Sequence, residues 1–435
     1  MVSLTEKLEE ALKSRSRRQI HRRIPPPSHS NPSGLIDFNS NDYLSLSTCA
    51  PLRDRFLQRL HSSPAILGSG GSRLLVNGSA HQALELRLAA FFKSPTALLF
   101  NSGFDANVGF FSAVPQAGDV VIYDEYIHAS VHDGIRASRT RHNGAHFAFT
   151  HNSVASLRHV LRNALHDKPA LRSGENCAIV AVESLYSMDG TFAPLKDIID
   201  LVEGLFPRGN GYVVVDEAHA TGLYGVQGRG LVALWGLENR VLARLHTFGK
   251  ALSGSGAVIL TSPIVREYLV NYARPLIYTT SLNNASIIAA DCSFDLLEDG
   301  TADELAKSLK DLTNHALDIL KRSLHAFPSD LVSLPNYLHE RNDHEIASPI
   351  IPLMSPHSRA LSEHLRDKGF NARPISWPTV PKGKDRIRIC LHAGNTKDEV
   401  ESLVREIVVW ANGVRTKKER DLRKQAIGIQ MEAKL

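Results

Sequence analysis

The stretch YVVVDEAHAT (212–221) places two groups able to do chemistry, Asp216 and His219, directly after an apolar run rich in valine. Such a run predicts a buried strand, with Asp216 at its carboxyl end. Two kinds of chemistry fit this position. Asp216 could hold Mg²⁺ beside a nucleoside triphosphate, since the letters DEAH are the signature of one group of helicases, or Asp216 and His219 could bind an organic cofactor.

The nucleotide interpretation requires a phosphate loop of the form G-x-x-x-x-G-K-[ST], whose backbone N–H groups wrap the phosphates. Gly-Lys occurs twice, at Gly249–Lys250 and at Gly383–Lys384, and neither pair has the earlier glycine or the following Ser/Thr. The GSGGS at 68–72 does not follow a convincing strand, so a dinucleotide fingerprint is unsupported as well. The sequence therefore argues against an ATPase.

The second informative stretch, HTFGKALSGSGAVIL (246–260), places Lys250 after a short predicted strand, among glycine and other small residues that let another group approach the backbone closely. A lysine in such a turn is usually a solvated charge, but Asp216 precedes it at the end of a predicted buried strand. Pyridoxal phosphate needs a lysine for its covalent attachment and a carboxylate to keep its ring nitrogen protonated. The glycine turn opening a helix at 102–111 suits its phosphate, and His128 could cover its ring.

The elements that must position these residues alternate between strand and helix. Short apolar runs rich in β-branched residues predict strands at 96–100, 119–123, 177–183, 212–216 and 257–262. A polar loop and a helical segment follow each of the first four, which is typical of an α/β fold whose mostly parallel sheet is covered on both faces. Because ligands bind beyond the carboxyl ends of such strands, the loops after these runs are the candidate site.

The chain divides into four expected segments. Residues 1–50 hold a helix (4–24) and a proline-rich link (25–34), and 51–290 form a large cofactor-binding domain. Residues 291–414 predict a smaller α+β domain with strands at 348–354 and 386–392 and a closing helix at 396–414. Residues 415–435 form a basic tail.

Composition narrows the function classes. The chain is 43% hydrophobic and 22% charged, as in ordinary globular proteins. The net charge is +5, but residues 1–30 and 414–435 each carry seven basic and three acidic residues, so the body between them sums to −3. This distribution predicts no nucleic-acid face. Four widely separated cysteines, Cys49, Cys177, Cys292 and Cys390, indicate no metal or redox pair and favour a reducing compartment.

The sequence has no apolar run of 18 residues, and its first ten residues lack the apolar core of a secretory signal. We therefore expect no membrane segment.

Taken together, the motifs resemble those of the α-oxoamine synthase family of fold-type-I pyridoxal phosphate enzymes, over roughly residues 4–414. The matching stretches are SNDYL (40–44), GSGGSR (68–73), NSGFDAN (101–107), DEYIHASVHDGIRAS (124–138), ESLYSMDG (183–190), VVVDEAHATGLYG (213–225), TFGKAL (247–252), SPIIP (348–352) and PTVPKG (378–383). The resemblance implies a pyridoxal 5'-phosphate cofactor and no metal.

The resemblance also assigns roles. Lys250 would form the covalent link to the cofactor, Asp216 would hold its pyridine nitrogen and His219 its phenolic oxygen. His128 would stack on the ring, and Ser187 would make a second contact to the phenolic oxygen. The family's phosphate and cofactor contacts fall on Gly103, Phe104 and Thr247. Thr280 matches a threonine that reaches the phosphate of the neighbouring subunit, which implies a homodimer with shared active sites.

Members of this family join an amino acid to an acyl thioester and release CO₂. Residues 6–23 resemble the start of the biotin-pathway members, which join alanine to a pimeloyl thioester, carried by coenzyme A or by a carrier protein. Arg22 would meet the far carboxylate of that chain, a role suited to guanidinium. The remaining substrate contacts would be Asn41, His128, Arg373 and Thr379, and Arg388 competes with Arg373 for the carboxylate.

Other readings stay open. A glycine C-acetyltransferase, an aminotransferase using the same lysine and aspartate, and a non-catalytic subunit are the alternatives, although Lys250 argues against the last. The chain also departs from the family pattern at Ser45 and Ser253, where glycine is usual, and at Asn395, where histidine is usual.

The sequence ends in Ala433-Lys434-Leu435, a conservative variant of the Ser-Lys-Leu address that a peroxisomal import receptor reads. This favours the peroxisome over a cytoplasmic location.

Overall fold

The computed structural model describes residues 2–18, 20–22, 24, 34–140, 144–340 and 346–432, with the side chains of its last helix described through Lys417 and at Arg420. Most of the expected proline-rich link and the tripeptide 433–435 lie outside the described residues. Contacts divide the chain into a small unit (1–40, 310–391 and 395–435) and a large unit (41–309 and 392–394).

This division differs from the expected segments at two places. The N-terminal segment groups with the small unit because β1 (Ile36–Asp37) pairs in parallel with β10 (Phe370–Asn371). Residues 291–309 group with the large unit, since α12 (Asn284–Glu298) packs on α2 (Ala50–Ser62) and α3 (Ser79–Phe91).

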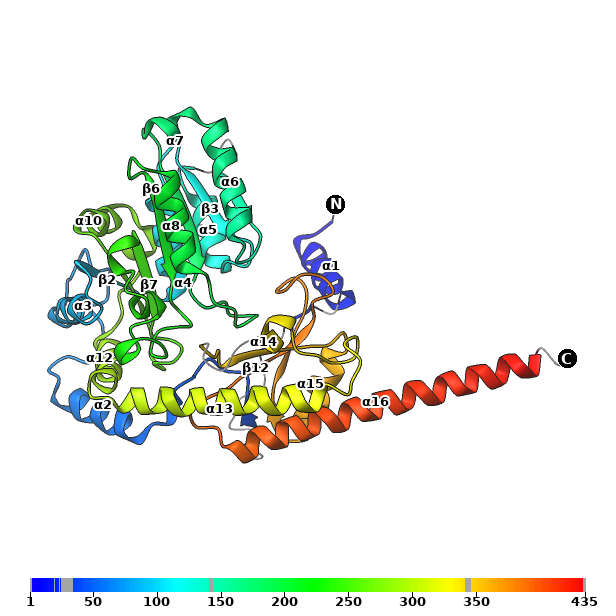
Figure 1. Cartoon of the computed structure of the whole chain (residues 1–435). Helices are drawn as coiled ribbons and strands as arrows, with labels where there is room; N and C mark the ends of the chain where they lie inside the picture. Colours follow the sequence, from blue (N-terminus) through cyan, green and yellow to red (C-terminus); the bar gives the residue numbers. More distant parts are fainter. Residues whose placement is uncertain are drawn as a thin grey trace. The chain divides into compact units, whose positions relative to one another are not determined.

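A seven-stranded sheet organises the large unit (Figure 1), in the order β2-β8-β7-β6-β5-β3-β4. Strands β7 to β4 in this order are mutually parallel, and β8 runs antiparallel to both of its neighbours. The strands are β2 (Thr96–Phe100), β3 (Val120–Asp124), β4 (His146–Phe149), β5 (Ala178–Glu183), β6 (Gly211–Asp216), β7 (Ala243–Thr247) and β8 (Ala257–Thr261).

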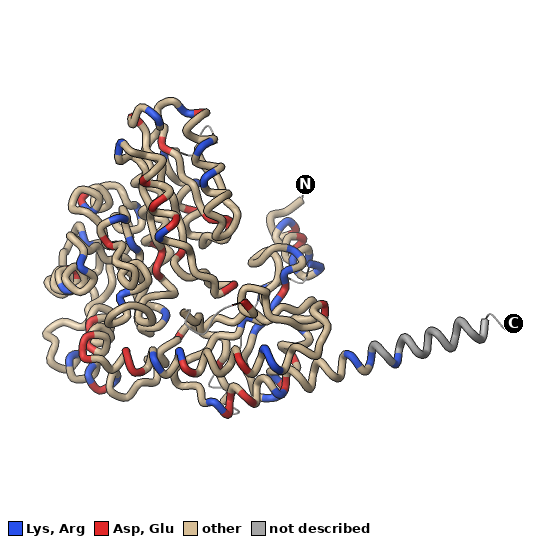
Figure 2. The backbone as a smooth tube through the Cα atoms, viewed as in Figure 1, with Lys and Arg blue, Asp and Glu red and all other residues tan. Residues whose placement is uncertain are grey.

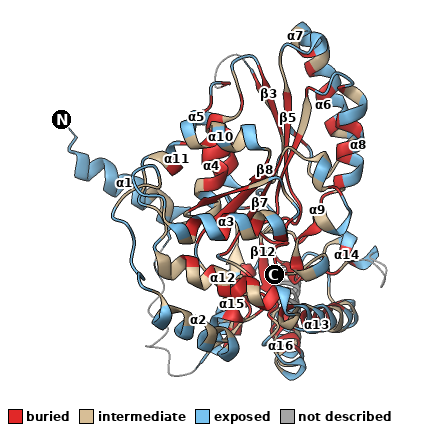
Figure 3. Ribbon diagram, turned by 90° about the vertical axis from the view of Figure 1, so that its left-hand side faces the viewer, coloured by how far each residue is buried: buried red, intermediate tan, exposed pale blue. Residues whose placement is uncertain are grey.

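Helices cover both faces of this sheet, and the strands are therefore the most buried part of the unit (Figure 3). All six residues of β5 are buried, which explains why this strand reads as a continuous apolar run rather than an alternating one. The remaining helices of the large unit are α4 (Gly103–Ala113), α5 (Ala129–Ala137), α6 (Val154–Asp167), α7 (Pro169–Ser173), α8 (Leu195–Leu205), α9 (Leu231–Leu234), α10 (Pro263–Tyr272) and α11 (Arg274–Ile277).

Ion pairs hold α2, α3 and α12 together. Arg87 of α3 pairs with Asp291, Asp295 and Glu298 of α12, and Arg59 of α2 pairs with the same two aspartates. Figure 2 shows basic and acidic residues interleaved along this part of the chain. The shared acceptors make this a network rather than a set of isolated surface pairs, which individually contribute little.

The small unit is α+β, as expected. Its three-stranded antiparallel sheet has the order β11-β12-β9, from β11 (Arg373–Ile375), β12 (Arg386–Cys390) and β9 (Ile350–Met354). Its helices are α1 (Leu4–Arg17), α14 (Asn336–Glu340), α15 (Ser358–Asp367) and α16 (Lys397–Glu432), and α13 (Thr301–Leu324) runs through the boundary between the units. No helix among the described residues is long and apolar enough to cross a bilayer.

Candidate active site

Three acidic residues end neighbouring strands of the large sheet. Asp124 closes β3, Glu183 closes β5 and Asp216 closes β6, and all three are buried. Glu183 lies directly opposite Asp216 in the parallel pairing. Burial raises the pKa of Glu183 well above its ordinary value; the Asp216 carboxylate raises it further, while Lys250 lowers it. The arrangement therefore favours a neutral Glu183.

Asp216 is held by two donors. Nδ2 of Asn107, on α4, lies 2.7 Å from its Oδ2, and the backbone N–H of Ala218 donates to its Oδ1 at 2.9 Å. Charge-assisted hydrogen bonds of this kind favour the carboxylate form. A cofactor nitrogen that must stay protonated would meet an anionic partner here.

His128 stands at the N-cap of α5, just past β3. Its ring lies edge-on to the ring of Phe104, with centroids 6.4 Å apart. Although the residue is exposed at its surface, the crowded surroundings lower the pKa of His128; Asp216 opposes this shift and Lys250 reinforces it. The structure thus brings His128, Phe104, Asp216 and Lys250 into one neighbourhood.

The N-terminus of α4 offers an anion site. Ser102 caps the helix and Gly103 is its first residue, so free backbone N–H groups point outward there. A Cβ on Gly103 would lie 3.4 Å from Cβ of Thr247, the last residue of β7. The hydroxyl of Thr247 accepts the backbone N–H of Gly249 at 3.3 Å. The predicted residues Gly103 and Thr247 are therefore adjacent.

Lys250 follows in the turn after β7. The backbone N–H of Ser253 donates to its carbonyl at 2.9 Å and closes that turn. The hydroxyl of Ser253 in turn donates to Asp42, which ties the lysine turn to the SNDYL segment.

His219 is buried and linked to Asn41 through a residue that the sequence analysis did not single out. The hydroxyl of Tyr43 lies 2.8 Å from Nδ1 of His219 and 3.2 Å from Oδ1 of Asn41. Tyr43 lies inside the quoted SNDYL motif, so the motif held the signal. Asn107 and Glu183 were likewise inside quoted motifs without being assigned a role.

The glutamate of DEAH supports the fold. Glu217 is fully buried and accepts the hydroxyl of Ser184 at 2.7 Å and the backbone N–H groups of Leu231 and Val232 at 3.0 and 2.7 Å. It thereby caps the start of α9. This carboxylate is occupied by the protein's own donors and offers nothing to Mg²⁺.

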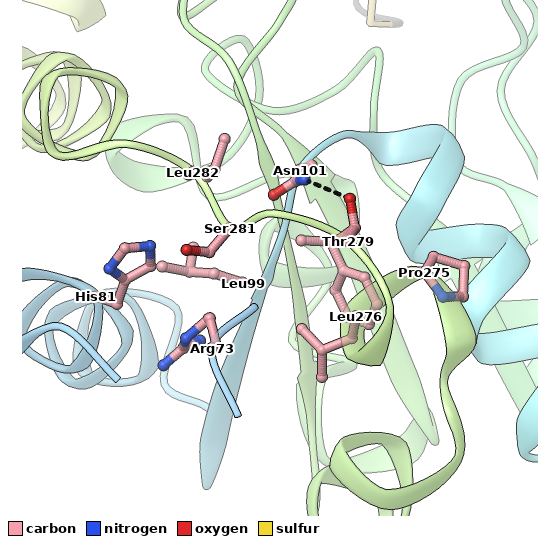
Figure 4. A pocket seen from close by; sticks show the side chains of 10 residues that line it. Arg73, His81, Leu99, Asn101, Pro275, Leu276, Thr279, Ser281 and Leu282 are labelled. Carbon is pink, nitrogen blue, oxygen red and sulfur yellow. Dashed lines mark hydrogen bonds between the residues drawn. The ribbon is translucent and has the colours of Figure 1, made fainter. Parts of the chain in front are cut away.

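Ser187 and Thr280 both lie outside the helices and strands. Ser187 is half-buried in the turn that Gly190 closes onto Tyr186 at 2.9 Å. Thr280 is exposed, and Asn101 donates to its carbonyl at 2.6 Å. A cavity of about 10 Å³ beside Asn101, Thr279 and His81 has room for about one water molecule and is no cofactor site (Figure 4).

The remaining predicted substrate residues belong to the small unit. Arg373 and Arg388 are direct cross-strand partners on β11 and β12, the first exposed and the second buried. Like charges directly opposite each other on neighbouring strands repel. Thr379 lies exposed in a turn, its N–H donating to Ser376 at 3.0 Å, and Arg22 is exposed after α1.

The large-unit residues fit pyridoxal phosphate. The start of α4 beside Thr247 would take the phosphate, Lys250 the covalent link, and Asp216 the ring nitrogen. When bound, the cofactor supplies an electron sink that stabilises a carbanion at the α-carbon of an amino acid. Among the described residues no group of three His, Cys, Asp or Glu is arranged to hold a metal ion.

Known proteins are similar to this chain in sequence and fold. The profile of the aminotransferase class I and II family matches residues 33–407. The chain is 43% identical to an 8-amino-7-oxononanoate synthase of Emericella nidulans, over 96% of this chain and 98% of that protein. It is 36% identical to the aminoacyl transferase sphA of Aspergillus fumigatus, over 87% and 81%. Its fold matches a serine palmitoyltransferase of Sphingomonas wittichii with a TM-score of 0.77, at 24% identity over 95% and 99%.

Fold and comparisons together define a fold-type-I enzyme that depends on pyridoxal phosphate. The chain belongs to the aminotransferase class I and II family and, within it, to the α-oxoamine synthases, which are pyridoxal phosphate-dependent acyltransferases.

Proposed function

We propose that the protein joins L-alanine to pimeloyl-CoA, or to another pimeloyl thioester, and releases the thiol and CO₂ to give 8-amino-7-oxononanoate in biotin biosynthesis. The observation that carries this proposal is the 43% identity, over nearly the whole of both chains, with the synthase of Emericella nidulans. The assignment of site residues below is part of the same proposal.

In this proposal Asp216 keeps the ring nitrogen protonated, supported by the donors Asn107 and Ala218. The amine of Lys250, once freed, removes the α-proton of alanine and later returns a proton to the product. The neighbouring Glu183, held neutral, adds no negative charge that would compete with Asp216 for the ring proton. Arg373 and Arg388, which are cross-strand partners, bind the amino-acid carboxylate together, so both residues have this role.

The experiment measures free thiol and CO₂ from the full chain loaded with cofactor, using alanine plus pimeloyl-CoA and, separately, glycine plus acetyl-CoA. We expect a higher kcat/KM for the first pair. Lys250→Ala serves as the inactive control. A higher kcat/KM with glycine and acetyl-CoA would instead make the protein a glycine C-acetyltransferase.

A second candidate is a related synthase with a different acyl donor. The 36% identity with the aminoacyl transferase sphA supports this second candidate. Long-chain acyl thioesters belong in the same assay for this reason. An aminotransferase would release a keto acid from alanine without consuming any thioester, so the same samples identify that outcome.

Arg22 supplies a specificity test. The residue is exposed, and its proposed role is to pair with the far carboxylate of the pimeloyl chain. Arg22→Ala should raise KM for pimeloyl-CoA and spare heptanoyl-CoA, which has no terminal carboxylate. Arg15→Ala, on the last turn of α1, is the matched control. Equal losses for both donors would make Arg22 a structural residue.

We propose that the enzyme works as a homodimer, with Thr280 reaching the phosphate of the neighbouring subunit. Exposed apolar side chains near Thr280 support this, because patches of this kind mark interfaces. They are Ile66, Leu67, Leu74, Leu75, Val76 and Tyr278. Their segment lies beside Thr280, since the N–H of Ser281 donates to Gly71 at 3.0 Å.

Two measurements test the dimer. Light scattering should give twice the mass of the chain, and Leu75→Lys should shift it toward the monomer. Mixing Lys250→Ala with Thr280→Ala subunits should restore activity if each site draws residues from both chains. A monomeric wild-type protein would refute the proposal.

Peroxisomal targeting is a separate proposal that rests on residues 433–435 of the sequence. A fluorescent protein fused to the N-terminus, with and without these three residues, tests it. Punctate signal lost on truncation supports targeting, and diffuse signal from the intact chain favours the cytoplasm.

A further inference from the structure

A chain of hydrogen bonds runs from Asp216 to His128 through two buried residues, Asn107 and Ser130. Nδ2 of Asn107 lies 2.7 Å from Oδ2 of Asp216 and 3.0 Å from Oγ of Ser130. Oγ of Ser130 lies 2.7 Å from Nδ1 of His128, and that nitrogen also accepts the backbone N–H of Ser130 at 3.2 Å. We call these four residues the relay.

The chemistry of each group gives the relay one direction. An amide nitrogen can only donate, so Asp216 and Ser130 both accept from Asn107. The reversed amide would set its oxygen against the Asp216 carboxylate, and two acceptors would then face each other. Because the backbone N–H of Ser130 donates to Nδ1 of His128, that nitrogen is an acceptor, and the hydroxyl of Ser130 also donates its one hydrogen to it. That nitrogen therefore carries no proton, and the ring N–H lies on Nε2.

The packing of two helices brings the relay together. Asn107 lies on α4 and Ser130 on α5, and both are buried, at 4% and 0% exposure. A Cβ on Gly134 of α5 would lie 2.8 Å from Cβ of Phe111 and 3.1 Å from the carbonyl oxygen of Asn107. Glycine at this position therefore lets α5 approach α4 closely enough for the two polar side chains to meet.

The charged groups around His128 act in both directions. Loss of water around part of the ring has the largest effect and lowers its pKa; Asp216 and Asp133 raise it, and Lys250 lowers it. His132, one turn along α5, is coupled to His128 by charge. The resulting direction agrees with a neutral ring, which the hydrogen-bond geometry requires independently.

We propose that Asn107 and Ser130 are positioning residues that hold His128 as the neutral Nε2–H tautomer and hold Asp216 as a two-fold acceptor. The consequence for the cofactor rests on the site assignment under the proposed function; the tautomer does not. One relay thus fixes two residues that lie on different elements, β6 and the N-cap of α5.

The test uses the full chain labelled with ¹⁵N-histidine, with and without bound cofactor. The signals of His128 are identified by their loss in His128→Phe, and their shifts report the tautomer and the titration. Wild type should show the Nε2–H form. Ser130→Ala removes the hydroxyl donor to Nδ1 and keeps only the backbone N–H, so it should raise the pKa of His128, and Ser130→Thr, which keeps the hydroxyl, should return this pKa to wild type.

Ser138→Ala is the matched control. Ser138 is a buried, hydrogen-bonded serine at the other end of α5, outside the relay. It should leave His128 unchanged. An unchanged His128 in Ser130→Ala would overturn the proposal, and so would an equal change in Ser138→Ala, which would indicate general loosening of the helix.

Asn107→Ala tests the hydrogen bond from Asn107 to Asp216. Losing a donor to the Asp216 carboxylate should raise the dissociation constant of pyridoxal phosphate about tenfold or more. Unchanged affinity would remove Asp216 from the relay. Neither readout uses substrate turnover, so a wrong choice of substrate leaves this result intact, and a failed relay leaves the reaction proposal standing.

Discussion

Replacing Glu217 by alanine tests whether this glutamate supports the fold, as its contacts indicate. Three donors point at its carboxyl group, from Ser184, Leu231 and Val232, and all three residues have 0% exposure. Leaving a buried donor unsatisfied costs about 1–3 kcal/mol. The hydroxyl of Ser184 can rotate to another partner, so the two backbone N–H groups dominate, and we expect a loss of about 3–5 kcal/mol.

A loss of this size lowers the melting temperature by roughly 6–20 °C, because 1 kcal/mol corresponds to about 2–4 °C in a domain of this size class. Glu217→Gln keeps the shape but sets one NH₂ against a backbone donor, so its loss should be smaller. Thermal melts of the full chain, followed by circular dichroism, measure both. Glu175→Ala is the control, since Glu175 is exposed, and it should stay within about 0.5 kcal/mol of wild type.

The two interpretations of DEAH give opposite results in this experiment. A metal-nucleotide role would leave the melting temperature of Glu217→Ala near wild type and would make wild type more stable in Mg²⁺ and ATP. A melting temperature within about 1 °C of wild type would refute the structural role. The surroundings of the side chain favour that role, since Gly230, at φ +96°, holds a backbone conformation that brings α9 against it.

Three further predictions concern the site and pH. Lys250→Ala should abolish turnover and the borohydride-reducible adduct with the cofactor, located by mass spectrometry; an adduct surviving elsewhere would contradict the assignment. Asp216→Asn should cut turnover by at least about 100-fold while the chain stays folded, because an amide cannot hold the ring proton; a near-wild-type rate would show that the ring charge is unimportant. Burial holds the pKa of His246 well below its ordinary 6.5. Below pH 6.5 the unfolded chain therefore binds a proton at this residue that the folded chain does not bind, and the stability of the folded chain falls as the pH drops. His246→Phe should flatten that fall by about 1.4 kcal/mol per pH unit in chemical denaturation, and an unchanged slope would assign it to other groups.

The strands of the large sheet were predictable because burial on both faces produces a continuous apolar run. The run at 177–183 matches β5 (Ala178–Glu183) closely. Strand β4 (His146–Phe149) was missed: it is short, lies at the sheet edge and has partly exposed residues. Its four residues, HFAF, are too few to stand out as a strand in the sequence.

The helix ends were predicted less well than the strands. The expected helix 4–24 ends at Arg17, and the expected helix 396–414 continues to Glu432. Helix α1 buries none of its residues, so no apolar stripe fixes where it stops. Beyond residue 414 the sequence is rich in Lys, Arg and Glu without proline, and helix propensity alone carries the element on.

The residues of the candidate site also differ in whether the sequence could predict them. Lys250, Asp216, His219 and His128 were accessible because each ends or follows a recognisable strand within a motif. Asn107 and Ser130 were not, because their importance comes from the contact between α4 and α5, which no local pattern encodes. A buried asparagine in a helix reads from sequence as one polar residue among many, and its two acceptors lie 23 and 109 residues away.

Two serines stand where the family usually has glycine, and their backbone conformations and hydrogen bonds explain how the chain accommodates them. Ser45 and Ser253 both adopt left-handed backbone conformations, with φ of 55° and 50°. For a residue with a Cβ this costs roughly 1–2 kcal/mol, which glycine avoids.

Each serine offsets that cost with a hydrogen bond that glycine could not make. The hydroxyl of Ser253 donates to Asp42, and that of Ser45 accepts the backbone N–H of Gly394 at 2.9 Å. Because Asp42 also accepts the N–H of Leu46, the carboxylate joins the two serine-bearing turns, one of which carries Lys250. The departures are therefore coupled: together they retain the backbone shape that glycine would give and add a side-chain link between the SNDYL segment and the lysine turn.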